Sequence, residues 1–123
     1  MPKILTDAYR DATFFITYNE DRTEGVYLKP LTDTMKGKLR NEAQKEAGAD
    51  DAQTGVIFVR KMIQESVQGW KGFYDVAGVD IPCDKEHIKE ICECDSEFTA
   101  GLMFRIQNVA RIGELEERKN FPP

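Results

Sequence analysis

One stretch of the sequence decides how the chain divides into helices and strands: residues 68–82 read QGWKGFYDVAGVDIP. It holds the only tryptophan of the chain and three of its nine glycines. Glycine and proline interrupt regular structure, and Val76-Ala77-Gly78 is flanked by two short apolar segments. We therefore predict that a helix ends at Gly69, that a small hairpin or omega-like loop follows, and that Pro82 closes this loop.

Helical spacing precedes this stretch. Apolar residues step by three and four along the chain, as one helical face requires: Val56, Val59, Ile63, Val67 and Trp70. The run 56–59 taken alone also fits a strand, but the helical spacing continues beyond it and favours a helix. We predict that this helix begins near Asp50 or Asp51 and that Trp70 plugs the core.

An earlier helix is predicted from Thr32 or Asp33, either of which can cap it, to Gly48. Its apolar residues recur at four-residue steps: Met35, Leu39, Ala43 and Ala47. Charged residues surround this thin apolar stripe, so we expect the helix to lie at the edge of the core.

The N-terminal part shows a period of two. Residues 12–18 are rich in β-branched and aromatic side chains, residues 19–25 are polar and end in glycine, and residues 26–29 form a second short apolar run. This pattern predicts two strands joined as an antiparallel hairpin, with Phe14, Ile16 and Tyr18 on one face.

Two further helices are predicted after Pro82. Asp84 caps the third, whose buried side is Ile88, Ile91 and Cys92. Asp95 or Ser96 caps the fourth, whose stripe is Phe98, Leu102, Ile106 and Val109, extending to Gly113. The fold class is therefore α+β in a single domain, residues 1–123. It comprises a small N-terminal hairpin, about four helices and a short aromatic hairpin loop between helices two and three. We expect residues 1–11 and 114–123 to fray.

The composition excludes several classes of protein. Apolar residues make up 41% of the chain, charged residues 32%, and the formal net charge is −5. An acidic chain without a basic patch does not favour nucleic-acid binding. No apolar run approaches the roughly 20 residues that a membrane span needs, and no signal peptide is recognisable at the start. The sequence predicts a cytoplasmic protein.

The candidate reactive residues are Cys83, His87, Cys92 and Cys94. Along a helix, Cys83 and Cys92 would lie roughly 13 Å apart, too far for a shared tetrahedral zinc site. A Cys83–His87 catalytic pair lacks a third, orienting group. We therefore predict reduced, metal-free thiols, no cofactor and no enzymatic activity.

The loop region carries a family resemblance over roughly residues 56–120. A helix leads into Gly69-Trp70-Lys71-Gly72, and Asp75 and Gly78 form a hairpin that leads to Ile81-Pro82. Asp84 then caps a helix, and two helices run to a charged end at residues 116–120. In these features the chain resembles the tail assembly chaperones of long-tailed phages and prophages.

The resemblance implies a protein without turnover chemistry, made in the host cytoplasm. Members of that family bind the tape-measure protein, keep it soluble and help to recruit tail-tube subunits. We expect the contact surface to comprise Phe73, Tyr74 and Val79 together with the apolar faces of the last two helices. Exposed edges of the two predicted strands also favour self-association into a dimer or ring. The alternatives are another protein-interaction module, such as an adaptor or inhibitor, and a thiol or zinc protein.

Overall fold

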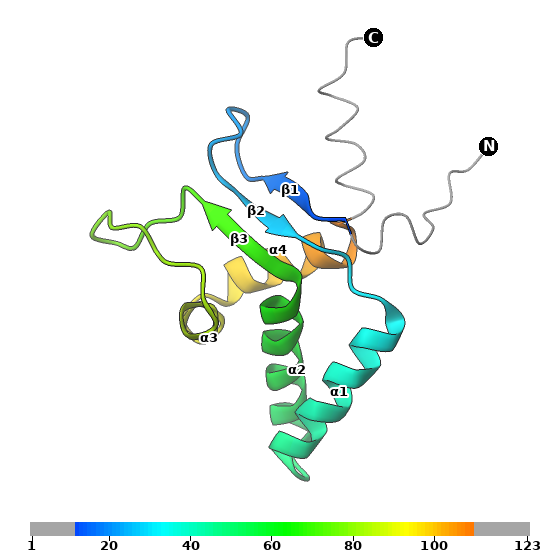
Figure 1. Cartoon of the computed structure of the whole chain (residues 1–123). Helices are drawn as coiled ribbons and strands as arrows, with labels where there is room; N and C mark the ends of the chain where they lie inside the picture. The colour runs from blue at the N-terminus through cyan, green and yellow to red at the C-terminus, as the bar shows by residue number, and fades with distance from the viewer. Residues whose placement is uncertain (1–11, 110–123) are drawn as a thin grey trace, which may run out of the picture.

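The computed structural model describes residues 12–109, which form a three-stranded antiparallel sheet and four helices (Figure 1). The strand order is β1-β2-β3. The α+β class predicted from the sequence is confirmed. The predictions for the two chain ends, including Gly113, concern residues outside the described range.

The predicted N-terminal hairpin is present. Strands β1 (Phe14–Thr17) and β2 (Gly25–Leu28) pair antiparallel, with Ile16 opposite Val26. The side chain of Asn19 organises the turn, because its Oδ1 accepts hydrogen bonds from the backbone N–H groups of Thr23 at 3.1 Å and Glu24 at 3.2 Å. An Asn side chain can satisfy backbone donors in this way without requiring a longer loop.

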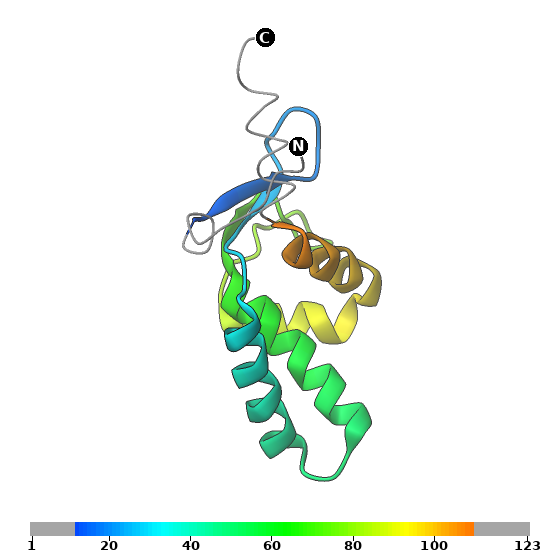
Figure 2. The same ribbon diagram turned by 90° about the vertical axis from the view of Figure 1, so that its right-hand side faces the viewer.

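Helices α1 (Asp33–Ala47) and α2 (Asp51–Ser66) begin where the caps predict. Thr32 Oγ1 accepts from the backbone N–H of Met35, and Asp50 Oδ1 accepts from that of Gln53. The two helices form an antiparallel hairpin that projects beyond the end of the sheet (Figures 1 and 2). Lys61 of α2 pairs with Glu46 of α1 at 2.7 Å, which ties the two helices together near the surface.

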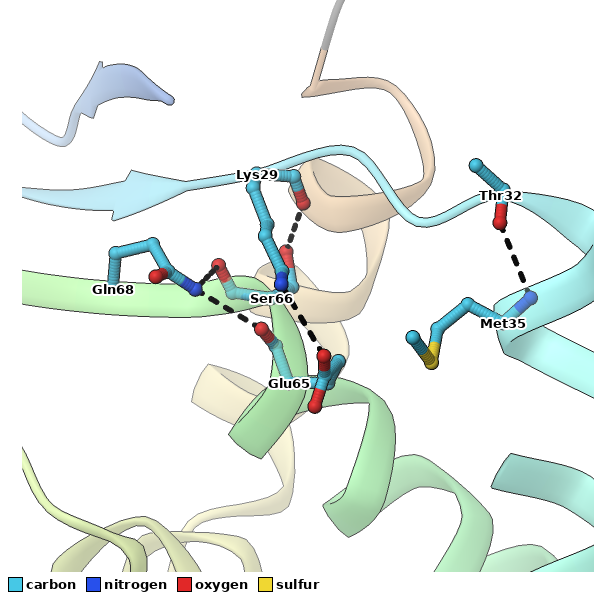
Figure 3. Close-up of polar contacts among 6 residues, drawn as sticks. All are labelled: Lys29, Thr32, Met35, Glu65, Ser66 and Gln68. Carbon is cyan, nitrogen blue, oxygen red and sulfur yellow. Dashed lines mark hydrogen bonds and ion pairs between the residues drawn. The ribbon is translucent and has the colours of Figure 1, made fainter. Parts of the chain in front are cut away.

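The predicted end of α2 at Gly69 is wrong. The helix ends at Ser66, and the next five residues form strand β3 (Val67–Lys71), which pairs antiparallel with β2. At the junction, Lys29 N–H donates to the Ser66 carbonyl at 2.9 Å. The buried Ser66 hydroxyl donates in return to the Lys29 carbonyl at 2.7 Å (Figure 3). Strand β2 is therefore the central strand, so the sheet edges are β1 and β3.

An irregular register explains this error. The ladder shifts between Tyr27 and Leu28, so that Leu28 pairs with Val67 while Tyr27 pairs with Gly69. Gln68 is the extra residue of a β-bulge. In a regular strand, residues three apart lie on opposite faces. Because of the bulge, Val67 and Trp70 both pack against the core although they are three residues apart. A spacing of three between buried residues is also typical of a helix, so the sequence pattern resembled a helical one.

The core lies between one face of the sheet and the helices. Helices α3 (Lys85–Cys94) and α4 (Ser96–Gln107) lie on the same side of the sheet (Figure 2). The buried side chains come from the sheet and from all four helices: Phe14, Ile16, Val26, Leu28, Leu39, Met62, Ile63, Val67, Ile88, Leu102, Ile106 and Val109. The predicted stripe of α4 is confirmed at Leu102, Ile106 and Val109, with Phe98 half-buried. In α3 only Ile88 is buried, and Ile91 and Cys92 are half-buried. In α2, Val59 is only half-buried and Val56 is exposed, because the far end of the helical hairpin extends past the core.

On the opposite face of the sheet, aromatic rings lie across glycines. The Phe15 ring lies against Gly25, and the Tyr27 ring lies against Gly69. The two rings contact each other with centroids 4.8 Å apart. Aromatic cover of this kind compensates for the side chains that glycine lacks in a strand.

Candidate functional site

The segment after β3 forms a short hairpin, residues 73–81, which we call the apolar loop. Gly72 precedes it with φ of +78°, a conformation that favours glycine. A Cβ at this position would lie 2.8 Å from the Thr23 carbonyl oxygen. The chain therefore leaves the sheet in close contact with the β1–β2 turn, and only glycine fits there.

Asp75 builds the tip of the apolar loop. Its carbonyl accepts from Gly78 N–H at 3.0 Å, and its own N–H donates to the Val79 carbonyl at 2.9 Å. Gly78 has φ of +80°, so the tip is a type I turn followed by a left-handed residue. The Asp75 carboxylate also accepts from the N–H groups of Ala77 and Val79. These bonds fix the tip in one conformation.

Two further hydrogen bonds hold the base of the loop. Ile81 N–H donates to the Phe73 carbonyl at 3.0 Å, beside the antiparallel bridge between Tyr74 and Asp80. The Trp70 indole N–H donates to the Ile81 carbonyl at 2.7 Å. Trp70 is half-buried and lies on a strand rather than a helix, so it joins the core and also anchors the loop.

Phe73 connects the loop to the core through an aromatic cluster. Its ring centroid lies 5.5 Å from that of Tyr18, 5.4 Å from Trp70 and 5.4 Å from Phe98. The pairs with Tyr18 and Phe98 are edge-to-face, and such pairs stabilise beyond simple burial. Burial also raises the pKa of Tyr18, an effect that the nearby Arg105 guanidinium opposes. Phe73 therefore positions the loop and is not one of its exposed contact residues.

The large exposed side chains of the loop are apolar, and they lie beside two exposed aspartates, Asp75 and Asp80. Tyr74 is 58% exposed, Val79 is 61% exposed and Val76 at the tip is fully exposed. The structure thus places two of the three predicted contact residues in solvent and adds Val76, which the sequence analysis did not select. The spacing of Asp75 and Gly78 is typical of a type I turn, in which Val76 is the first of the two central residues. This signal in the sequence could have identified Val76 as the tip residue.

The predicted apolar faces of the last two helices are not available to a partner. Ile88 of α3 and Leu102 and Ile106 of α4 are buried in the core. A small cleft between β3, α2, α3 and α4 is lined by apolar side chains and has no room for a water molecule. The apolar loop is therefore the candidate contact surface.

Burial affects the acidity of two of the three thiols, and His87 is hydrogen-bonded to the cap of α3. Burial raises the pKa of both Cys83 and Cys92, so neither thiol is activated as a thiolate. His87 Nδ1 lies 2.7 Å from Asp84 Oδ1, which also accepts from the His87 backbone N–H at 2.8 Å as the cap of α3. Both hydrogen bonds lower the pKa of the Asp84 carboxyl, and the bond from the His87 backbone N–H has the larger effect.

The described part of the chain contains neither a candidate metal cluster nor a candidate membrane-spanning helix. Between residues 12 and 109, no group of three or more His, Cys, Asp or Glu side chains could hold a metal ion. Within the same range, no helix combines the length and the apolar character needed to cross a membrane. Asp75 and Asp84 are used in the loop tip and the helix cap instead.

We compared the chain with family models, with curated proteins and with solved structures, and none of the three comparisons gave a match.

Proposed function

We propose that this protein is a tail assembly chaperone of a long-tailed phage or prophage, which binds the tape-measure protein and keeps it soluble in the host cytoplasm. The observation that carries the proposal is the apolar loop, where Tyr74, Val76 and Val79 are exposed on a tip that the Asp75 carboxylate holds in place. The family resemblance involves this same segment, from Gly69 to Pro82.

The loop suits protein binding for physical reasons. Exposed aromatic and aliphatic side chains are the usual anchors of protein interfaces. Binding costs less conformational entropy when the contact segment is already fixed, as the Asp75 hydrogen bonds fix this tip. A net charge of −5 favours solubility of the chain and of a complex with an apolar client. The proposed role involves no turnover chemistry, and tail-tube subunits are the second expected partner.

The loop by itself supports protein binding in general. A different interaction module, such as an adaptor or inhibitor of a host protein, would use the same exposed side chains. The tape-measure client rests on the resemblance, so the test must include that client and must also ask which residues bind it.

The test is co-expression of the full chain with the tape-measure protein of the same phage or prophage genome. We expect the wild type to yield a soluble complex. Tyr74→Asp and Val79→Asp should weaken binding at least about tenfold, which corresponds to ~1.4 kcal/mol. Val56→Asp is the matched control, because Val56 and Val79 are both 61% exposed and Val56 lies on α2, away from the loop.

The outcomes separate the two proposals. A tape-measure protein that stays insoluble, with no complex recovered, would refute the chaperone function and leave the general interaction module. If a complex forms but both loop variants bind as tightly as Val56→Asp, the contact surface is not the apolar loop. A cooperative thermal melt for each variant shows that the loss of binding is not caused by unfolding.

A further inference from the structure

The apolar loop lies within a strongly acidic segment of the chain. Residues 73–97 contain eight Asp or Glu against two Lys and no Arg, which gives this segment a formal charge of −6 and more than accounts for the −5 of the whole chain. Two of these acidic residues, Asp75 and Asp80, belong to the loop itself. All eight are exposed: Asp75, Asp80, Asp84, Glu86, Glu90, Glu93, Asp95 and Glu97.

The outer side of α3 extends the negative charge beyond the loop. Glu86, Glu90 and Glu93 follow one another at steps of four and three residues, so they share the helix face opposite the buried Ile88. The loop and α3 lie on the same side of the molecule, beyond β3 (Figure 1). Ile81 at the end of the loop lies four residues before the start of α3, a connection of at most roughly 14 Å.

These carboxylates are not neutralised within the described part of the chain. Between residues 12 and 109, the ion pairs of Lys and Arg all involve Glu42, Glu46 or Glu65, which belong to α1 and α2. None of these pairs reaches an acidic residue of the loop or of the outer side of α3. Exposed charges act over about 10 Å at 0.1 M salt, so the surface around the loop stays negative.

We propose that the apolar loop binds a client segment that is both apolar and basic, in which lysine or arginine flanks the apolar residues. The proposal rests on the proposed function, because it names the chemistry of the client that the same loop holds. Tyr74, Val76 and Val79 supply the apolar contact, and the surrounding carboxylates attract the basic side chains. The same negative charge repels nucleic acid and anionic lipid, which favours a protein segment as the occupant.

Two substitutions of Val79 test the charge of the client. Val79→Asp and Val79→Lys both remove the apolar contact and differ in the sign of the added charge. At about 50 mM NaCl we expect the tape-measure protein to bind Val79→Lys about tenfold more weakly than Val79→Asp, because lysine repels a basic segment. At about 500 mM NaCl the ratio should fall to about two or less, since salt screens exposed charges. Val56→Asp and Val56→Lys are the matched controls and should bind equally, because Val56 is also 61% exposed but lies on α2.

A second set of variants tests the outer side of α3. The double variant Glu90→Gln with Glu93→Gln removes two charges, and we expect binding about fivefold weaker and less dependent on salt. Asp33→Asn with Asp51→Asn removes the same charge from exposed positions on the helical hairpin and should change binding by less than about twofold. A cooperative thermal melt for each variant excludes unfolding as the cause.

The outcomes separate this proposal from the proposed function. If the tape-measure protein binds without regard to the sign of the charge at position 79, or if the double glutamate variant binds like its control, the client segment is not basic and the chaperone function stands. If the tape-measure protein does not bind, a peptide of alternating leucine and lysine is the probe, with a leucine–glutamate peptide as its control. Tighter binding of the leucine–lysine peptide, weakened in Val79→Lys, then supports a basic client without the chaperone function. Equal binding of the two peptides, or none, overturns both.

Discussion

Replacement of Phe73 by aspartate is expected to unfold the protein, whereas the same change at the neighbouring Tyr74 is expected to leave the fold intact. Phe73 contacts Tyr18, Trp70 and Phe98, so the substitution removes three ring contacts and introduces a carboxylate among apolar side chains. Truncating a core phenylalanine costs about 3–5 kcal/mol; Phe73 is half-buried, so we expect a loss near the lower end of this range, to which a carboxylate placed beside apolar rings adds. This loss is a large share of the free energy of unfolding of a small domain, which is roughly 5–15 kcal/mol.

Thermal melts followed by circular dichroism distinguish the two positions. Phe73→Asp should show no cooperative transition or a melting temperature lower by at least about 12 °C, taking ~4 °C for each kcal/mol. Tyr74→Asp, exposed on the loop, should melt within a few degrees of the wild type. Equal melts for the two variants would mean that Phe73 is a surface residue and that the aromatic cluster does not stabilise the fold.

Gly25→Ala is expected to destabilise the sheet strongly. An added Cβ would lie 2.5 Å from the Ile16 carbonyl oxygen and 2.6 Å from Cζ of Phe15. The carbonyl belongs to the backbone of β1 and cannot move without shifting the strand, and displacing the Phe15 ring loses its contacts with Tyr27 and Lys71. Overpacking of this kind costs about 1–3 kcal/mol.

Gly69→Ala is the matched control on the same face of the sheet. Its added Cβ would meet only Cδ2 of Tyr27, at an ordinary contact distance of 3.7 Å. Urea denaturation should therefore give a lower midpoint for Gly25→Ala and a nearly unchanged midpoint for Gly69→Ala. The midpoint falls by about 1 M for each 1–3 kcal/mol of unfolding free energy that is lost. A Gly25→Ala midpoint at or above that of the control would contradict the close approach of β1 and β2.

The local elements of the fold could be predicted because local chemistry determines them. Thr32, Asp50, Asp84 and Asp95 cap their helices through their own side chains, and such caps are visible in sequence. The antiparallel hairpin before α1 was likewise evident from its period of two. Strand β3 could not be predicted, because its pairing partner β2 lies about forty residues earlier and the bulge at Gln68 imitates helical spacing.

The candidate site was only partly predictable for the same reason. Tyr74 and Val79 were selected as contact residues, and both are exposed. Phe73 was selected with them, yet its environment depends on Tyr18 and Phe98, which the sequence does not place beside it. Which of two adjacent aromatic residues faces the core depends on tertiary packing that no local pattern encodes.

The position of the helical hairpin between β2 and β3 affects the order of folding. Leu28 and Val67 pair directly although 38 residues separate them, and closing so long a loop in a disordered chain costs entropy. Helices α1 and α2 form from local contacts and run antiparallel, so their pairing returns the end of α2 to the start of α1. We expect the helical hairpin to form first and the β2–β3 ladder to follow. Folding kinetics of point variants would then give φ-values (the ratio of the change in folding activation free energy to the change in stability) near one in α1 and α2 and near zero in β3. The slow, non-local step of sheet formation then becomes the docking of two segments that are already close together.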